Sequence, residues 1–277
     1  KDVRGTNTAV YTTNFTSPTE TLTAIANTQL LTCHASYIAD GSSNSNAITI
    51  AGNTSTKRFG PYDYLGYTKA DHGGSVYFDG VDDRLTVASN SDFNIGSDFT
   101  FECWCYPTSS SNAGASGNAL LMLVWNGSNN SVWLSYTSAT KFEFRISYVG
   151  GWAHTLTSTD NFAINQWYHV AATRNSGTTY LFINGVQQAT GSNNTDVSST
   201  GNTVSIGSQG TGRYFQGYIK DASRIVKSAV YTSAFTPPTA PLTAITNTQL
   251  LTCTNKNDIW EQGSGSLLTK VGNTTAS

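Results

Sequence analysis

The sequence has little charge, few cysteines and no long apolar segment. Only 12% of its 277 residues are charged and the net charge is −2, so it lacks the basic surface by which proteins bind nucleic acids or anionic membranes. No apolar run approaches the roughly 18–20 residues that span a bilayer. We therefore expect no nucleic-acid partner and no insertion into a membrane.

Helical periodicity is almost absent as well, and short segments with alternating apolar residues replace it. Residues 99–105 place two phenylalanines and two cysteines on one face, and the apolar run 119–125 is typical of a strand buried on both faces. Residues 166–190 predict a three-stranded meander, because Asn184-Gly185 between apolar strands favours a tight hairpin turn. The expected fold is all-β, with two packed antiparallel sheets in a sandwich or jelly roll.

A long internal repeat is present. Residues 9–33 return as residues 229–253 without a gap, and 19 of the 25 positions are identical. A period of 220 residues is far longer than the roughly 20–50 residues of solenoid and propeller repeats. We therefore expect a tandem array of independent domains, of which this chain is a piece.

The repeat suggests a division of the chain into four parts. These are the tail of a preceding repeat with a Thr/Pro linker (1–28), a complete sandwich domain (29–236), a Pro-rich linker (237–248) and the start of a following repeat (249–277). Residues 235–247 contain three of the six prolines, which predicts an extended and rather stiff segment.

The four cysteines are Cys33, Cys103, Cys105 and Cys253, and the first and last occupy the same position of the repeat. Cys103 and Cys105 lie two apart on the expected strand, at roughly 6.5–7 Å, which is too far for a disulfide. We expect buried free thiols, with a bridge from Cys33 to Cys103 or Cys105 as the alternative. Free thiols favour folding in a reducing compartment.

The carboxylates do not form a catalytic pattern. Glycoside cleavage requires two carboxylates about 5–10 Å apart, whereas Glu102 and Glu143 each lack an acidic neighbour two positions away. We expect Glu143 to pair with Arg145 at the surface, and His169 to make structural hydrogen bonds. We therefore do not expect an enzyme.

One acidic loop leaves two interpretations open. Asp79, Asp82 and Asp83 surround a glycine turn, and hard oxygen ligands in a loop suit Ca²⁺. Asp and Gly are also ordinary turn residues. The sequence predicts no other cofactor.

Sugar binding needs exposed aromatic faces. Tyr148 and Trp152 flank a Gly-Gly pair, and Trp125 precedes a polar loop. These three residues are the candidate ligand-binding residues, with Trp152 first. The alternative is that they cover the core or a contact between domains.

Four blocks of the chain, at 73–87, 90–107, 165–187 and 217–242, resemble in order and spacing the laminin-G-like, concanavalin A-like jelly-roll family. The resemblance covers residues 29–245. Within this family, the chain is similar to the form found as tandem units in phage tail fibres and other surface proteins. The resemblance implies a concanavalin A-like sandwich with roles in carbohydrate binding, adhesion and structural display, and calcium in some members.

Together these features predict a non-catalytic recognition and display module at a virion surface or in another extracellular setting. The expected partners are a host surface glycan or other virion subunits, with a homo-oligomer as a further option. Weak sites would gain strength through repetition. The alternative is a purely structural spacer or assembly module of a virion or of a bacterial or archaeal surface protein.

Overall fold

The computed structural model divides the chain into two compact units, Lys1–Thr68 and Lys69–Ser277, which are described separately. The structure describes residues 3–16, 18, 22–32, 42–46, 74–111, 117–127, 130–148, 151–198, 200–210, 212–253, 268–272 and 275–276, without the side chains of residues 151–153, 221–223, 268 and 275–276.

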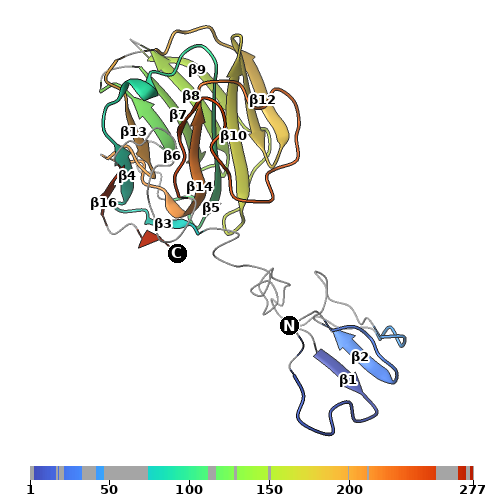
Figure 1. Cartoon of the computed structure of the whole chain (residues 1–277). Helices are drawn as coiled ribbons and strands as arrows, with labels where there is room; N and C mark the ends of the chain where they lie inside the picture. The colour runs from blue at the N-terminus through green and yellow to red at the C-terminus, as the bar shows by residue number, and fades with distance from the viewer. Residues whose placement is uncertain are drawn as a thin grey trace. The chain divides into compact units, whose positions relative to one another are not determined.

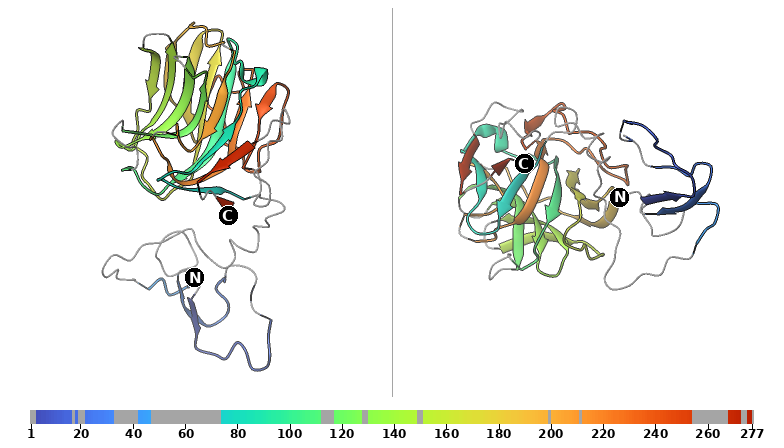
Figure 2. Two further views of the ribbon diagram at one scale, coloured as in Figure 1. Left: turned by 90° about the vertical axis from the view of Figure 1, so that its left-hand side faces the viewer. Right: turned by 90° about the horizontal axis from the view of Figure 1, so that it is seen from below.

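The second unit is a sandwich of two antiparallel sheets, which face each other in Figures 1 and 2. The eight-stranded sheet has the order β12-β11-β10-β5-β14-β3-β17, and β15 also pairs with β14. Its strands are β3 (Val76–Asp79), β5 (Phe99–Pro107), β10 (Tyr168–Asn175), β11 (Thr178–Ile183), β12 (Val186–Ser192), β14 (Gln216–Val226), β15 (Thr248–Leu250) and β17 (Thr275–Ala276).

The second sheet has seven strands in the order β16-β4-β13-β6-β7-β8-β9. They are β4 (Arg84–Val87), β6 (Asn118–Trp125), β7 (Ser131–Thr137), β8 (Phe142–Tyr148), β9 (Gly151–Thr157), β13 (Thr203–Ile206) and β16 (Leu268–Val271). A short 3-10 helix, η1, covers Ser91–Phe93, and within the described residues no helix is long and apolar enough to cross a membrane.

The core lies between the two sheets and follows the alternation in the sequence. On β5, Phe99 and Phe101 point inward and are fully buried, and the Phe99 ring meets Phe144 of the opposite sheet at a centroid distance of 6.0 Å. Strand β6 is buried on both faces, as its apolar run predicted. The all-β, concanavalin A-like sandwich predicted from the sequence is confirmed.

The predicted meander is confirmed as β10, β11 and β12. Its hairpin turns are Ser176-Gly177, with φ of 48° and 80°, and Asn184-Gly185, with φ of 50° and 77°. Two consecutive residues with positive φ match the right-handed twist of the flanking strands.

After β14 the chain does not leave the sandwich. Residues 223–252, here called the closing strap, comprise the end of β14, an irregular segment that contains the Pro-rich part, and β15, which returns to pair with β14. Further along, β16 pairs with β4 and β17 pairs with β3. Strands from the segment 249–277 therefore belong to this sandwich, and the four-part division remains a prediction about the sequence repeat.

The first unit contains β1 (Val3–Thr6) paired with β2 (Thr28–Thr32). The segment 3–32 is here called the leading strap, and its described residues adopt the local structure of the closing strap at an offset of 220 residues. Between strands, the pair Gly5–Leu30 corresponds to Ile225–Leu250. Arg4 donates to the Thr23 carbonyl as Arg224 does to the Thr243 carbonyl. The Tyr11–Phe15 ring stack corresponds to the Tyr231–Phe235 stack, and Asn27 and Asn247 both have a positive φ.

Candidate functional site

The sequence-predicted ligand residues Trp125, Tyr148 and Trp152 belong to strands β6, β8 and β9 of the seven-stranded sheet. Trp125 is opposite Ser131, Ser131 is opposite Ser147, and Ser147 is opposite Trp152, so the two tryptophans occupy one register row. Tyr148 is 46% exposed, whereas the side chain of Trp152 lies outside the described part of the structure. Their role in binding stays a prediction.

Two described tryptophans of this face, Trp125 and Trp133, pack against neighbouring side chains. Trp125 packs against a cluster of Leu120, Leu123 and Trp133. Trp133 is only 3% exposed, and the guanidinium groups of Arg213 and Arg145 lie over its ring at 4.6 and 5.6 Å. Among the described side chains of this face, Trp125 and Trp133 therefore act as packing residues, which corresponds to the alternative interpretation for Trp125.

The outer face of the eight-stranded sheet carries a different aromatic surface. Tyr77, Tyr218 and Tyr106 stand opposite one another on three neighbouring strands, with ring centroids 5.0 and 6.0 Å apart. Trp167 extends this row, at 5.5 Å from Tyr106, and is 41% exposed. In the next row of the sheet, half-buried Trp104 is opposite Lys220. Large flat rings and the Lys220 ammonium group thus share one face.

The closing strap forms the second wall of a groove on this face. The groove has a volume of about 410 Å³ and is lined by Trp104, Trp167 and Lys220 from the sandwich and by residues 238–241 from the strap. We call it the aromatic groove. Its volume lies in the range of small-molecule sites, which are mostly apolar with a few polar groups.

A buried ionic cluster fastens the strap beside the groove. Arg224 Nε donates to Glu102 Oε1 at 2.6 Å, and the Tyr231 hydroxyl donates to Glu102 Oε2 at 2.9 Å. His169 Nε2 lies 3.2 Å from the same oxygen and is fully buried, so its predicted structural role is confirmed. Burial raises the pKa of Glu102, but the hydrogen bond from His169 and the charge of Arg224 outweigh it, so the pKa lies below the usual 4.5.

The second candidate carboxylate is engaged in its own pair. Glu143 Oε2 lies 2.6 Å from Arg145 Nη2 and accepts a hydrogen bond of 2.7 Å from Asn118. The pair was expected, but its side chains are only 20% and 13% exposed, so it is more buried than a surface pair. Glu102 and Glu143 lie on different sheets, and each binds an arginine instead of facing the other.

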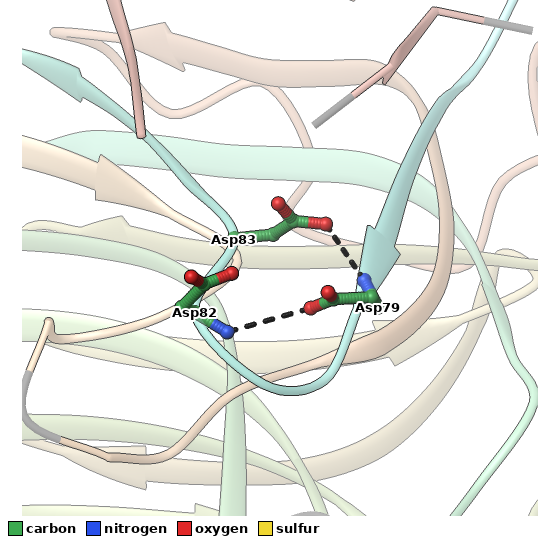
Figure 3. A group of neighbouring side chains, drawn as sticks. All are labelled: Asp79, Asp82 and Asp83. Atoms are coloured by element: carbon green, nitrogen blue, oxygen red, sulfur yellow. Dashed lines mark hydrogen bonds between the residues drawn. The ribbon is translucent and has the colours of Figure 1, made fainter. Parts of the chain in front are cut away.

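The acidic loop between β3 and β4 brings its three carboxylates together (Figure 3). One oxygen from each of Asp79, Asp82 and Asp83 lies within 4.8 Å of the others. Asp79 Oδ1 accepts from the Val81 and Asp82 amides, and Asp83 Oδ2 accepts from the Asp79 amide at 2.9 Å. These bonds are turn chemistry, and the calcium interpretation stays a prediction.

The described cysteines form no disulfide with one another. Cys103, Cys105 and Cys253 are buried thiols. Burial, together with the neighbouring Cys103 thiol, raises the pKa of Cys105 well above its usual 9.0, which keeps it protonated and unreactive. Cys33 lies outside the described residues.

Comparison with known proteins agrees with this fold. The family model of the concanavalin A-like lectin/glucanases superfamily matches residues 78–237, more than half of the chain, and the chain belongs to this laminin-G-like family. A search of curated proteins found no match.

Among solved structures, a Bacteroides ovatus ATCC 8483 protein described as carbohydrate binding aligns at 18% identity with a TM-score of 0.54, over 75% of this chain and 60% of that chain. Mouse laminin alpha1 domains LG4-5 align at 15% identity with a TM-score of 0.44, over 62% and 49%. A pentraxin from Limulus polyphemus aligns at 14% with a TM-score of 0.44, over 58% and 78%. At sequence identities this low, the similarity extends to the fold alone.

Sequence reasoning missed the aromatic groove. Trp104 and Trp167 stand 63 positions apart (167 − 104), in blocks that served only as fold signatures. One signal was available: Trp104 alternates with the inward-facing Cys103 and Cys105, so it had to face outward on the same strand. The position of the strap over that face could not be inferred from alternation.

Proposed function

We propose that the protein is a non-catalytic carbohydrate-binding module and that its aromatic groove holds the ligand. The observation that carries this proposal is the placement of 41% exposed Trp167 beside Trp104 and Lys220 in a preformed groove. Sugars present CH surfaces that stack on aromatic faces and hydroxyls that bind polar groups. Trp167 supplies the face and Lys220 a hydrogen-bond donor.

A binding role is favoured over catalysis because of how the two candidate carboxylates are used. Glu102 is buried beneath the strap with Arg224, His169 and Tyr231, so no substrate can reach it without displacing the strap. Glu143 is held by Arg145 on the other sheet. A hydrolase would need an accessible pair of carboxylates.

The setting that we propose is a tandem array on a virion appendage, such as a phage tail fibre, or on another extracellular surface. The repeat of 25 residues and the family resemblance support it. In such an array each groove need bind only weakly, because linked contacts act at high effective concentration.

The test is binding of the full chain to a broad glycan array, with calcium and with a chelator. Trp167→Ala is expected to lower the affinity for a bound glycan at least tenfold, which corresponds to about 1.4 kcal/mol. Trp152→Ala and Tyr148→Ala test the hairpin site predicted from the sequence. If they abolish binding while Trp167→Ala retains it, the aromatic groove is not the site.

A spacer or assembly module is the second candidate. The observation that favours it is the leading strap, which repeats the local structure of the closing strap but presents its aromatic residues to solvent. A chain that binds no glycan under either condition would support this candidate.

A further inference from the structure

The aromatic and cationic residues of the closing strap hold it against the eight-stranded sheet. Glu102 enters between Arg224 and Tyr231 and accepts hydrogen bonds from both, at 2.6 and 2.9 Å. The Phe235 ring stacks on Tyr231 at 3.7 Å, and the Phe235 amide donates to the Gly185 carbonyl at 3.0 Å. Arginine, tyrosine and phenylalanine thus form a clamp around a carboxylate from the eight-stranded sheet.

The leading strap carries the same clamp in the same conformation. Its residues are Arg4, Tyr11 and Phe15, each 220 positions before its counterpart. The Tyr11 and Phe15 rings stack at 3.8 Å with an interplanar angle of 13°, against 3.7 Å and 10° in the closing strap. Arg4 donates to the Thr23 carbonyl at 3.0 Å, as its counterpart does to Thr243 at 3.1 Å.

What differs is the surface against which the clamp packs. Tyr11 is 47% exposed and Phe15 is 55% exposed, whereas both counterparts are half-buried on the sheet. The leading strap also has a hollow of about 300 Å³, lined by Arg4, Thr6, Val10, Tyr11 and Leu22. The hollow lies between the arginine and the tyrosine, where the closing strap holds the Glu102 carboxylate.

We propose that the leading strap docks on the outer face of the eight-stranded sheet of a further copy of this sandwich, joined ahead of it in a longer chain. The Glu102 carboxylate of that copy enters the hollow between Arg4 and Tyr11. The leading strap and the eight-stranded sheet of that copy then form the same contacts that the closing strap forms with the eight-stranded sheet of the second unit. This interaction involves no glycan, so it stands or falls independently of the proposed function.

Charge and availability select this partner. The hollow offers an arginine and a tyrosine hydroxyl, which together suit one carboxylate on an apolar face. The sheet of the second unit carries such a carboxylate, but its closing strap already covers it. The partner must therefore be a sandwich of the same kind whose cover is the leading strap.

The test extends the full chain at its N-terminus by a second copy of residues 33–220, so that residue 220 of the added copy is followed by Lys1. This junction preserves the 220-residue period. The extended protein is expected to unfold in one calorimetric transition with roughly twice the enthalpy of the original chain, because two equivalent sandwiches form.

The substitution Tyr11→Ala tests whether the leading strap packs on the added sandwich or makes no contact with it. In the extended protein it is expected to lower the melting temperature of the added sandwich by about 5 °C, splitting the transition into two, while the original chain with the same substitution keeps its melting temperature. Tyr231→Ala is the matched control and should destabilise the second unit in both proteins.

Two results would overturn the proposal. One is an extended protein whose melting profile Tyr11→Ala leaves unchanged although the added copy is folded. The other is a dimer of the original chain, detected by sedimentation, that Tyr11→Ala dissociates, because the partner would then be a separate chain.

Discussion

The Tyr231 hydroxyl donates a hydrogen bond of 2.9 Å to the Glu102 carboxylate, although the two residues are 129 positions apart. This contact joins the closing strap to the middle of the eight-stranded sheet. Because Arg224 and His169 bind the same carboxylate, the strap is held by a buried ionic network beside the aromatic groove. The strap wall of the aromatic groove therefore depends on this network.

Removing the charge of Glu102 is expected to loosen the strap. Glu102→Gln leaves Arg224 buried without its counter-ion, which costs about 3 kcal/mol in the free energy of unfolding. Chemical denaturation at neutral pH measures this loss. A loss below about 1 kcal/mol would show that the network contributes little.

The same residue predicts a pH dependence. The pKa of Glu102 is lower in the folded than in the unfolded chain, so the unfolded chain binds more protons in the window between the two values. The stability that this carboxylate contributes is present above the usual pKa of 4.5 and is lost as the pH falls through the folded value. Glu102→Gln should flatten this part of the stability profile, and Glu143→Gln should retain it.

The turn at Gly185 is expected to tolerate no side chain. Its φ is 77°, and a Cβ at this position would overlap the Phe235 carbonyl of the strap. Gly127, with φ of 81° and no atom within 4 Å of such a Cβ, is the matched control for the backbone cost alone. Gly185→Ala should destabilise the sandwich by about 2 kcal/mol more than Gly127→Ala, measured by thermal unfolding. Equal effects would place the strap away from this turn in solution.

Substitutions in the acidic loop can distinguish a structural turn from a calcium site. Asp83 is 1% exposed and accepts the Asp79 amide, so Asp83→Ala should cost about 1–3 kcal/mol even with a chelator present. The side chain of Asp82 is exposed, so Asp82→Ala should change stability little without calcium. If calcium raises the melting temperature and Asp82→Ala removes that increase, the cluster is a cation site.

The sequence predicted what depends on alternation and local turns. The inward face of β5, with Phe99 and Phe101, follows from period-2 spacing, and the Asn184-Gly185 turn follows from its need for positive φ. Both are fixed by a few neighbouring residues. The repeat likewise identified two segments whose local conformations prove alike.

The sequence did not predict what depends on contacts between distant segments. Trp167 directly precedes β10, and its exposure beside Trp104 and the strap becomes apparent only once the strands and the strap are in place. The Pro-rich segment predicted an extended linker, but its proline spacing carries no sign that Phe235 and Tyr231 would cover Glu102. Burial of a carboxylate under a strap arises from tertiary packing, which no local pattern encodes.

The most direct test of the central claim is a binding titration of the full chain with a glycan identified on the array, for wild type, Trp167→Ala and Tyr148→Ala. The account predicts that Trp167→Ala weakens binding at least tenfold while the protein keeps its melting temperature, and that Tyr148→Ala binds as wild type does. Unchanged affinity in Trp167→Ala, with affinity lost in Tyr148→Ala, would contradict it and place the ligand on the hairpin of the seven-stranded sheet.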